Sequence, residues 1–306
     1  MTAEPHAASI NGMLHYGNSV DKFETVGGLE MHYLDYPGPQ PTVVLLHGLS
    51  ANANEFCGLI EGGLGRAHRV IAPDLRGRGK SSKPESGYSM GDHAADVIAL
   101  LDHLGLQQVV MGGHSFGALL AIYLAAHCPE RVSKVIVIDA AIVFHPDVVE
   151  LLKPSLARLE RILPSAEAYM QEMRAAPHVL GFWDDAIEGY FRAELGENAD
   201  GTVQSLTSAR AVEQALLGVQ AEPWADLVAR VKHPALLLNA AKGFGPPGSP
   251  PLVPPEHARM TAESFSDCHY VAVPGNHLTM VFGENAWVVA REIEHFLANG
   301  AGTANE

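Results

Sequence analysis

The sequence predicts an α/β protein with a mostly parallel central sheet, helices on both faces, and a helical segment inserted in the sheet-forming chain. Three observations predict it. Short, dense apolar runs recur along the chain, amphipathic helical patterns separate them, and this alternation stops for about ninety residues, from 144 to 232. The 306 residues are 47% hydrophobic and 18% charged, which is typical of a folded globular chain rather than a disordered one.

The first strands are expected on either side of Gly27-Gly28, because residues 23–25 and 29–36 flank this pair as the arms of a hairpin would. The apolar runs that follow lack polar alternation, which is typical of strands buried on both faces. The expected strands are residues 43–46, 70–72, 109–111, 135–138, 236–238 and 270–273.

Helices are expected between these strands. Ser89 and Asp92 have the spacing of a capping box, and a helical stripe follows them. That stripe is Val97, Leu100, Leu101 and Leu104, and a second one near the end of the chain is Val289, Ile293, Phe296 and Leu297. Strands that alternate with helices form parallel sheets, and such sheets bind ligands beyond the carboxyl ends of their strands.

Residues 144–232 contain helical stripes and no convincing strand, so we expect a helical cap over the strand ends. The chain then divides into a flexible N-terminal arm (1–20), a core (21–143 and 233–306) and the cap (144–232). As a group, the aromatic and methionine side chains of the cap are candidates for lining a pocket: Met170, Met173, Phe182, Trp183 and Phe191.

Composition limits the partners and the compartment. The 35 acidic and 20 basic residues give a formal charge of −15, which disfavours nucleic acid, anionic membranes and anionic substrates. Three cysteines without a paired framework fit a reducing compartment, and neither a secretory leader nor a run of about 18 apolar residues is present. We therefore expect a cytoplasmic protein, and homo-oligomers remain open. The 16 histidines show no zinc-binding spacing, so no metal or cofactor is expected.

The strongest chemical signal directly follows the strand at 109–111. Gly113-His114-Ser115-Phe116-Gly117 leads from this strand into an apolar, small-residue helix. A Gly-x-Ser-x-Gly sequence between a strand and a helix is the nucleophile-elbow pattern, in which glycines let the chain turn sharply around a strained serine. Ser115 is therefore the expected nucleophile, at a helix N-terminus that favours developing negative charge.

With these residues in view, the sequence from about 23 to 297 resembles the α/β-hydrolase fold family. Two stretches look like its segments after the third and fourth strands: Leu45-Leu46-His47-Gly48-Leu49 and Ala72-Pro73-Asp74-Leu75-Arg76-Gly77-Arg78-Gly79-Lys80-Ser81. The resemblance implies that the main-chain N–H groups of Leu49 and Phe116 form the oxyanion hole. It also implies structural roles for His47 and Asp74.

The base and the acid follow from chain order. Hydrolases of this fold run Ser, acid, His, and His277 lies between the last apolar run and the last helix, so His277 is the expected base. Most family members carry the acid in the loop after the strand at 235–239, where this chain places Gly243 and has no Asp or Glu before residue 255. Either the triad is incomplete, or the acid comes from another strand end. Asp139 ends the strand at 135–138 and resembles the acid of haloalkane dehalogenases and some lipases.

These residues favour a serine hydrolase that cleaves small to medium carboxylic esters through an acyl-enzyme, with Ser115, His277 and Asp139 as its triad. Its expected partner is a small, neutral, apolar ester. A carbon–carbon bond hydrolase or a lactonase on the same fold is one alternative, although ring-cleavage hydrolases of the family generally carry Asn where this chain has His114. A non-catalytic ligand-binding protein is the other, because the usual acid is missing.

Overall fold

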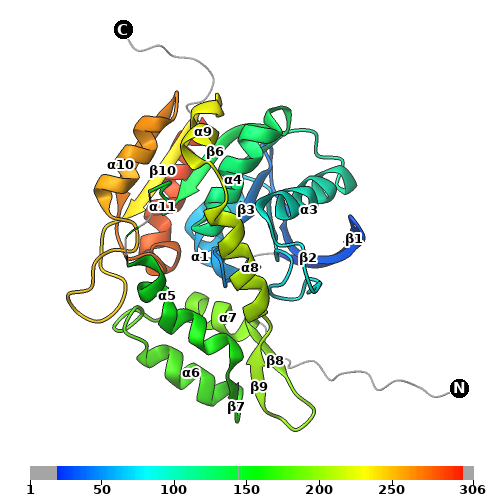
Figure 1. Ribbon diagram of the computed structural model, residues 1–306, viewed down its shortest axis with the longest axis vertical. Coiled ribbons are helices and arrows are strands. Elements are labelled where there is room, and N and C mark those ends of the chain that lie inside the picture. The colour runs from blue at the N-terminus through cyan, green and yellow to red at the C-terminus, as the bar shows by residue number, and fades with distance from the viewer. Residues whose placement is uncertain (1–18, 144, 146, 299–306) are drawn as a thin grey trace, which may run out of the picture.

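A sheet of eight strands forms the centre of the molecule (Figure 1). The computed structural model describes residues 19–143, 145 and 147–298, so all but the last two positions of the predicted arm (1–20) lie outside the described residues. The strand order is β1-β2-β4-β3-β5-β6-β10-β11. The strands are β1 (Val20–Val26), β2 (Leu29–Tyr36), β3 (Val43–Leu46), β4 (Val70–Pro73), β5 (Val109–His114), β6 (Val132–Ile138), β10 (Ala235–Ala240) and β11 (Cys268–Val273).

The sheet confirms the predicted fold class. β1, β2 and β4 pair antiparallel, and the pairs from β4 through β3, β5, β6 and β10 to β11 are parallel. The predicted hairpin is present, and Gly27 and Gly28 at its turn have φ values of 57° and 84°. The six other strands are the dense apolar runs of the sequence. Because the strands from β4 to β11 are parallel, their carboxyl ends lie at the same edge of the sheet.

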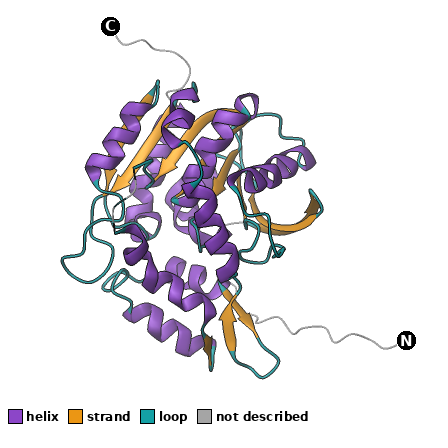
Figure 2. Cartoon of the chain, viewed as in Figure 1, coloured by secondary structure: helices purple, strands orange, loops and turns teal. Residues whose placement is uncertain are grey.

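Helices cover both faces of the sheet (Figure 2). They are α1 (Cys57–Leu59), α2 (Gly65–Ala67), α3 (Met90–His103), α4 (Phe116–His127), α5 (Val148–Ala157), α6 (Ala166–Ala175), α7 (Asp185–Ala193), α8 (Ala209–Gln220), α9 (Trp224–Arg230), α10 (Pro255–Ser264) and α11 (Gly283–Ala298). Short helical turns are η1 (Ala53–Phe56), η2 (Ile60–Leu64), η3 (Pro129–Arg131), η4 (Arg158–Glu160) and η5 (Thr279–Val281). No helix among the described residues is both long enough and apolar enough to cross a bilayer.

Alternating residues of the strands belong to two hydrophobic clusters, one on each face of the sheet. On β10, Leu237 belongs to the cluster that α3, α4, α9 and α10 complete, whereas Leu236 and Leu238 belong to the cluster that α1, α11 and α7 complete. Strands buried on both faces need apolar residues at every position, which explains the continuous runs in the sequence. At the start of α3, Ser89 and Asp92 form the predicted capping box.

Between β6 and β10 the chain forms α5 to α9 and a small second sheet. The expectation of no strand in this segment was wrong. β7 (Ile162–Leu163), β8 (Leu195–Glu197) and β9 (Val203–Ser205) pair antiparallel in the order β7-β9-β8. Strands of two or three residues are too short to show polar–apolar alternation, so their sequence gives no periodic signal. In Figure 1 this sheet and α5, α6 and α7 lie together at one end of the molecule.

Candidate active site

Ser115 occupies a strained turn between β5 and α4. Its φ of 53° and ψ of −115° place it outside the ordinary regions for a residue with a side chain. The neighbouring glycines make this turn sterically feasible. A Cβ on Gly113 would collide with the carbonyl of Gly117, and one on Gly117 would collide with the carbonyl of Leu46. The Gly-x-Ser-x-Gly pattern is thus explained by close backbone contacts around the serine.

Asp139 and His277 meet at the same edge of the sheet. Asp139 directly follows β6 with a φ of 48°, and His277 lies between β11 and η5. The Oδ2 atom of Asp139 is 2.7 Å from Nδ1 of His277, and both residues are buried, with 1% and 7% of their surfaces exposed. Because the carboxylate can only accept, Nδ1 of His277 carries the proton and Nε2 is left as the proton acceptor.

The second carboxylate oxygen of Asp139 is fixed from the neighbouring strand. Oδ1 accepts hydrogen bonds from Nδ2 of Asn239 and from the main-chain N–H of Ala240, each at 2.9 Å. Asn239 is itself held by the hydroxyl of Tyr270, which donates to its Oδ1 at 3.1 Å. The carboxyl end of β10, where most of the family carries the acid, therefore supplies two hydrogen-bond donors to Asp139 instead.

Hydrogen bonds of Asn276 hold the loop that carries His277. Asn276 Oδ1 accepts from the main-chain N–H groups of Leu278 and Thr279, and Asn276 Nδ2 donates 2.7 Å to the carbonyl of His178 in the cap. Burial, and after it the neighbouring His114, lowers the pKa of His277 although Asp139 acts in the opposite direction. His277 is therefore a neutral imidazole near neutral pH, as a general base must be.

The loop after β3 carries the first expected oxyanion donor, Leu49. His47 shapes this loop: its Nδ1 donates 2.7 Å to the carbonyl of Gly48, and its Nε2 accepts from the N–H of Leu75 at 2.9 Å. Asp74 binds the turn beyond it, since Oδ1 accepts from the N–H of Ala53 at 2.7 Å. Both side chains bond to the protein's own backbone, which is a structural arrangement.

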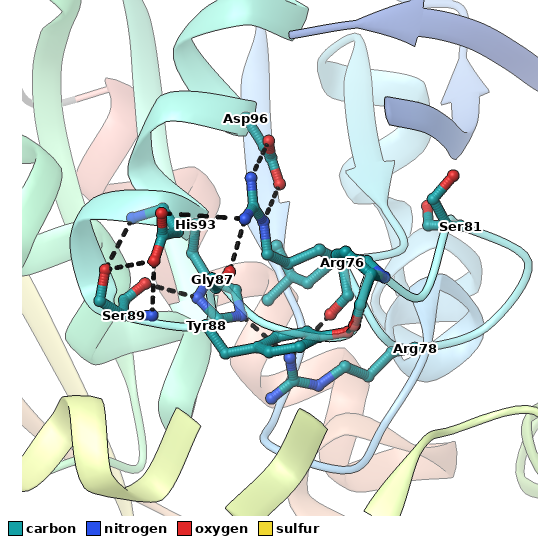
Figure 3. Close-up of polar contacts among 12 residues, drawn as sticks. Arg76, Arg78, Ser81, Gly87, Tyr88, Ser89, His93 and Asp96 are labelled. Atoms are coloured by element: carbon teal, nitrogen blue, oxygen red, sulfur yellow. Dashed lines mark hydrogen bonds and ion pairs between the residues drawn. The ribbon is translucent and has the colours of Figure 1, made fainter. Parts of the chain in front are cut away.

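Arg78 bonds to the loop that carries Leu49. Figure 3 shows its side chain near those of Tyr88 and His93. Its Nε donates 2.9 Å to the carbonyl of Leu49, and its Nη1 donates to the carbonyl of Arg76 and to Nε2 of His93. The guanidinium also lies 5.4 Å from the ring centroid of Phe116, the second expected donor. Arg78 is fully buried, and burial lowers its pKa to about 9. It therefore touches both residues of the expected oxyanion hole.

Ser115, Asp139 and His277 all line one cavity of about 270 Å³, together with Leu49 and Phe116. The rest of its wall is mostly apolar. From the cap and the segment after β10 come Val148, Leu152, Leu156, Met173, Phe191, Leu216, Val219, Phe244, Leu252 and Val253. Of the cap's methionine and aromatic candidates, Met173 and Phe191 line the cavity, while Met170, Phe182 and Trp183 are not among its lining residues.

One ion pair of the cap also reaches the cavity. Arg158 lines it, and its Nε and Nη2 bind the two carboxylate oxygens of the buried Glu194 at 2.9 and 3.0 Å. Nη2 of Arg158 further contacts the carbonyl of Ser50, next to Leu49, at 3.3 Å. The cap is thereby joined to the loop of Ser50 and Leu49 by an Arg–Glu ion pair, whose net charge is zero.

Sequence reasoning missed several functional candidates. Asn239 and Arg78 were not singled out, and Glu55 was not considered at all. Glu55 lies beside the nucleophile, where it bonds to His114 and to the N–H of Gly48. A polar residue at a strand's carboxyl end was the available signal for Asn239. Across residues 19–143, 145 and 147–298, no three His, Cys, Asp or Glu side chains gather as a metal-ion site would require.

Comparison with known proteins agrees with this architecture. The sequence profile of a family described as alpha/beta hydrolase fold matches residues 41–284. The 2-(acetamidomethylene)succinate hydrolase of Mesorhizobium japonicum is 29% identical over 245 residues, which cover 78% of this chain and 81% of that protein. A soluble epoxide hydrolase of a Corynebacterium species is 37% identical over 114 residues, but the match spans only 39% of that protein.

Solved structures show the same fold. The crystal structure of E-2-(acetamidomethylene)succinate hydrolase superimposes with a TM-score of 0.80 at 23% identity and covers 92% of this chain and 100% of that one. A thermophilic esterase from Thermogutta terrifontis superimposes with a TM-score of 0.69 at 24% identity, over 91% of this chain and 98% of that one. At these identities the likeness establishes the arrangement of strands and helices.

Proposed function

Because the chain belongs to the α/β-hydrolase fold family, we propose that it cleaves small to medium, neutral carboxylic esters through an acyl-enzyme on Ser115. One observation carries the proposal. The buried Asp139–His277 hydrogen bond of 2.7 Å lies in the same cavity as the strained Ser115. A serine, a base with a free Nε2 and an acid that fixes the imidazole are the parts that acyl transfer needs.

In the proposed reaction, Ser115 Oγ attacks the ester carbonyl while Nε2 of His277 takes the serine proton. Negative charge develops on the carbonyl oxygen, where the main-chain N–H groups of Leu49 and Phe116 and the N-terminus of α4 stabilise it. The imidazolium then gives its proton to the leaving alkoxide. Water attacks the acyl-enzyme with His277 again as the base, and the carboxylic acid leaves. No step calls for a metal ion or a cofactor.

The cavity supports neutral and apolar substrates. Most of its lining residues are apolar, and a volume of about 270 Å³ suits an acyl group of modest size. Its cationic Arg158 is already bound by Glu194, so the guanidinium gives no net attraction for a free carboxylate. The chain's formal charge of −15 also disfavours the approach of an anionic substrate.

A second candidate comes from the relative that matches 78% of the chain. That protein is a 2-(acetamidomethylene)succinate hydrolase, whose substrate name describes an acetamido group and two carboxylates. The triad chemistry above also serves an amide carbonyl. These contacts favour the ester, since a dianion entering the cavity would find Arg158 paired with Glu194 and His114 paired with Glu55, and neither pair carries a net positive charge.

Labelling with a fluorophosphonate tests the nucleophile first. The wild-type protein should be labelled on Ser115, and the Ser115→Ala variant should not. A series of p-nitrophenyl esters of increasing acyl length, set against a lactone, an amide and 2-(acetamidomethylene)succinate, then tests the substrate class. We expect the highest kcat/KM for short to medium esters. A folded wild-type protein that resists labelling would support the ligand-binding alternative, and a preference for the amide or the lactone would overturn ester specificity.

A further inference from the structure

Two buried ionisable side chains beside the nucleophile have no part in the mechanism above. Glu55 lies on η1, and His114 is the last residue of β5, directly before Ser115. Both line the active-site cavity, and only 2% and 3% of their surfaces are exposed. Nδ1 of His114 is 3.0 Å from Oε1 of Glu55, so the two side chains form a pair.

The pair joins two loops of the site. Oε2 of Glu55 accepts the N–H of Gly48 at 2.8 Å, immediately before the expected oxyanion donor Leu49. On the other side, Nε2 of His114 lies 2.7 Å from the carbonyl oxygen of the base, His277. A continuous chain of hydrogen bonds therefore runs from the oxyanion loop to the main chain of the base.

The contacts and the electrostatics together indicate the protonation of the pair. Nε2 of His114 faces a carbonyl oxygen, which can only accept, so Nε2 carries a proton; beside an ionised Glu55, Nδ1 carries one as well and the ring is an imidazolium. Burial by itself would lower the pKa of His114, but Glu55 reverses this and raises it. Burial would likewise raise the pKa of Glu55, and His114 reverses this and lowers it. The pair is thus ionised.

We propose that Glu55 and His114 are positioning residues that hold the oxyanion loop against the base loop, and that the His114 cation keeps His277 unprotonated as the pH falls. The inference rests on the proposed function, because it takes His277 to be the base of Ser115. The two imidazole rings lie with their centroids 4.5 Å apart, so protonation of His277 would place a second cation against the first.

Every group that faces His277 enters this balance. Asp139, at the end of β6, contacts Nδ1 and favours the protonated ring, and Glu55 on η1 favours it from farther away. His114 on β5 opposes protonation, and the ring of Phe244, after β10, packs edge-on at 5.6 Å and adds no charge. The cation of His114 is therefore the charged group that offsets the pull of Asp139.

The test measures the rate of fluorophosphonate inactivation between pH 5 and pH 9. This rate follows the unprotonated fraction of His277 and does not depend on the identity of the substrate. The variants are Glu55→Gln and His114→Gln, which remove charge and keep amide groups for the hydrogen bonds. Glu24→Gln is the matched control, because Glu24 also pairs with a histidine, His103 at 3.3 Å, but on the exposed strand β1.

We expect the acid limb of the rate profile to move to higher pH in both variants. The ratio of the rate at pH 5.5 to that at pH 8 should fall by about three- to tenfold, as expected for loss of a charge next to the ring. The Glu24→Gln profile should match that of the wild type. An unshifted acid limb in folded Glu55→Gln and His114→Gln proteins would overturn the proposal. A wild-type protein that is not inactivated at any pH would instead overturn the proposed function.

A measurement on the wild-type protein keeps the inference testable if a variant does not fold. With histidine labelled by ¹⁵N, NMR at pH 8 should show His114 with both ring nitrogens protonated. Whichever of the two variants folds assigns the signal, since it disappears in His114→Gln and changes to a neutral ring in Glu55→Gln. A wild-type spectrum in which His114 has a single protonated nitrogen would overturn the charged pair.

Discussion

Replacing Asp139 by asparagine tests the acid that comes from β6 rather than from the strand where most of the family carries it. Oδ1 of Asp139 accepts hydrogen bonds from the side chain of Asn239 and the main-chain N–H of Ala240, so in the variant only the amide oxygen can take this position. The asparagine amide must therefore turn its NH₂ toward Nδ1 of His277. Nδ1 then becomes an acceptor, and the proton moves to Nε2, where Ser115 needs a base.

The wrong tautomer should cost about 10⁴ in kcat, as the same exchange does in a serine protease, which is about 5 kcal/mol of transition-state stabilisation. KM should change little, because Asp139 contacts His277 rather than the substrate. The assay is hydrolysis of a short p-nitrophenyl ester, with circular dichroism to confirm the fold. Asp267→Asn is the control, since Asp267 is exposed before β11, at the opposite end of the sheet. A kcat for Asp139→Asn within tenfold of the wild type would refute the assignment.

Three further predictions concern residues of the proposed triad and the groups around it. Because burial and His114 lower the pKa of His277, kcat/KM should fall only below pH 6.5 as protonation removes the base, and a pH profile with its acid midpoint above 6.5 would contradict this. Arg78→Met removes the donor to the Leu49 carbonyl, so kcat should drop by about tenfold, less than the loss of a whole oxyanion donor, with KM unchanged in steady-state assays. Glu194→Gln leaves the buried guanidinium of Arg158 without its carboxylate, and urea unfolding should show a loss of about 3 kcal/mol; a change below 0.5 kcal/mol would contradict it.

Local patterns carried most of what the sequence predicted. Gly27-Gly28, the Ser89 capping box and the elbow around Ser115 each depend on residues within a few positions of one another, so sequence spacing reveals them. The central strands could be predicted because strands buried on both faces of a sheet consist of continuous apolar runs. No local pattern could predict that Asp139 lies beside His277, since 138 residues separate them. That pairing was predicted from the order Ser, acid, His in the resembling family.

The rest depends on contacts that no local pattern encodes. Glu55 and His114 are 59 residues apart, and Asn239 and Asp139 are 100 apart, so only the tertiary fold brings each pair together. No local pattern predicts that Arg78 is buried, yet it is fully buried because backbone carbonyls and His93 accept hydrogen bonds from most of its donors. The strands of the cap sheet pair over two or three residues, below the length at which alternation can be recognised.

In the proposed triad the acid follows β6 and not β10, so the residues that would react and the residues that would select the substrate come from different segments of the chain. The proline-rich loop after β10, residues 241–254, holds no member of the proposed triad, yet Phe244, Leu252 and Val253 from it form part of the cavity wall. Its conformation can therefore be redesigned without displacing a reacting group, provided that the carbonyl of Val253 still accepts from Asn239. Loops from other members of the fold could be grafted at this site as interchangeable modules, each giving a new acyl pocket in front of one unchanged catalytic apparatus.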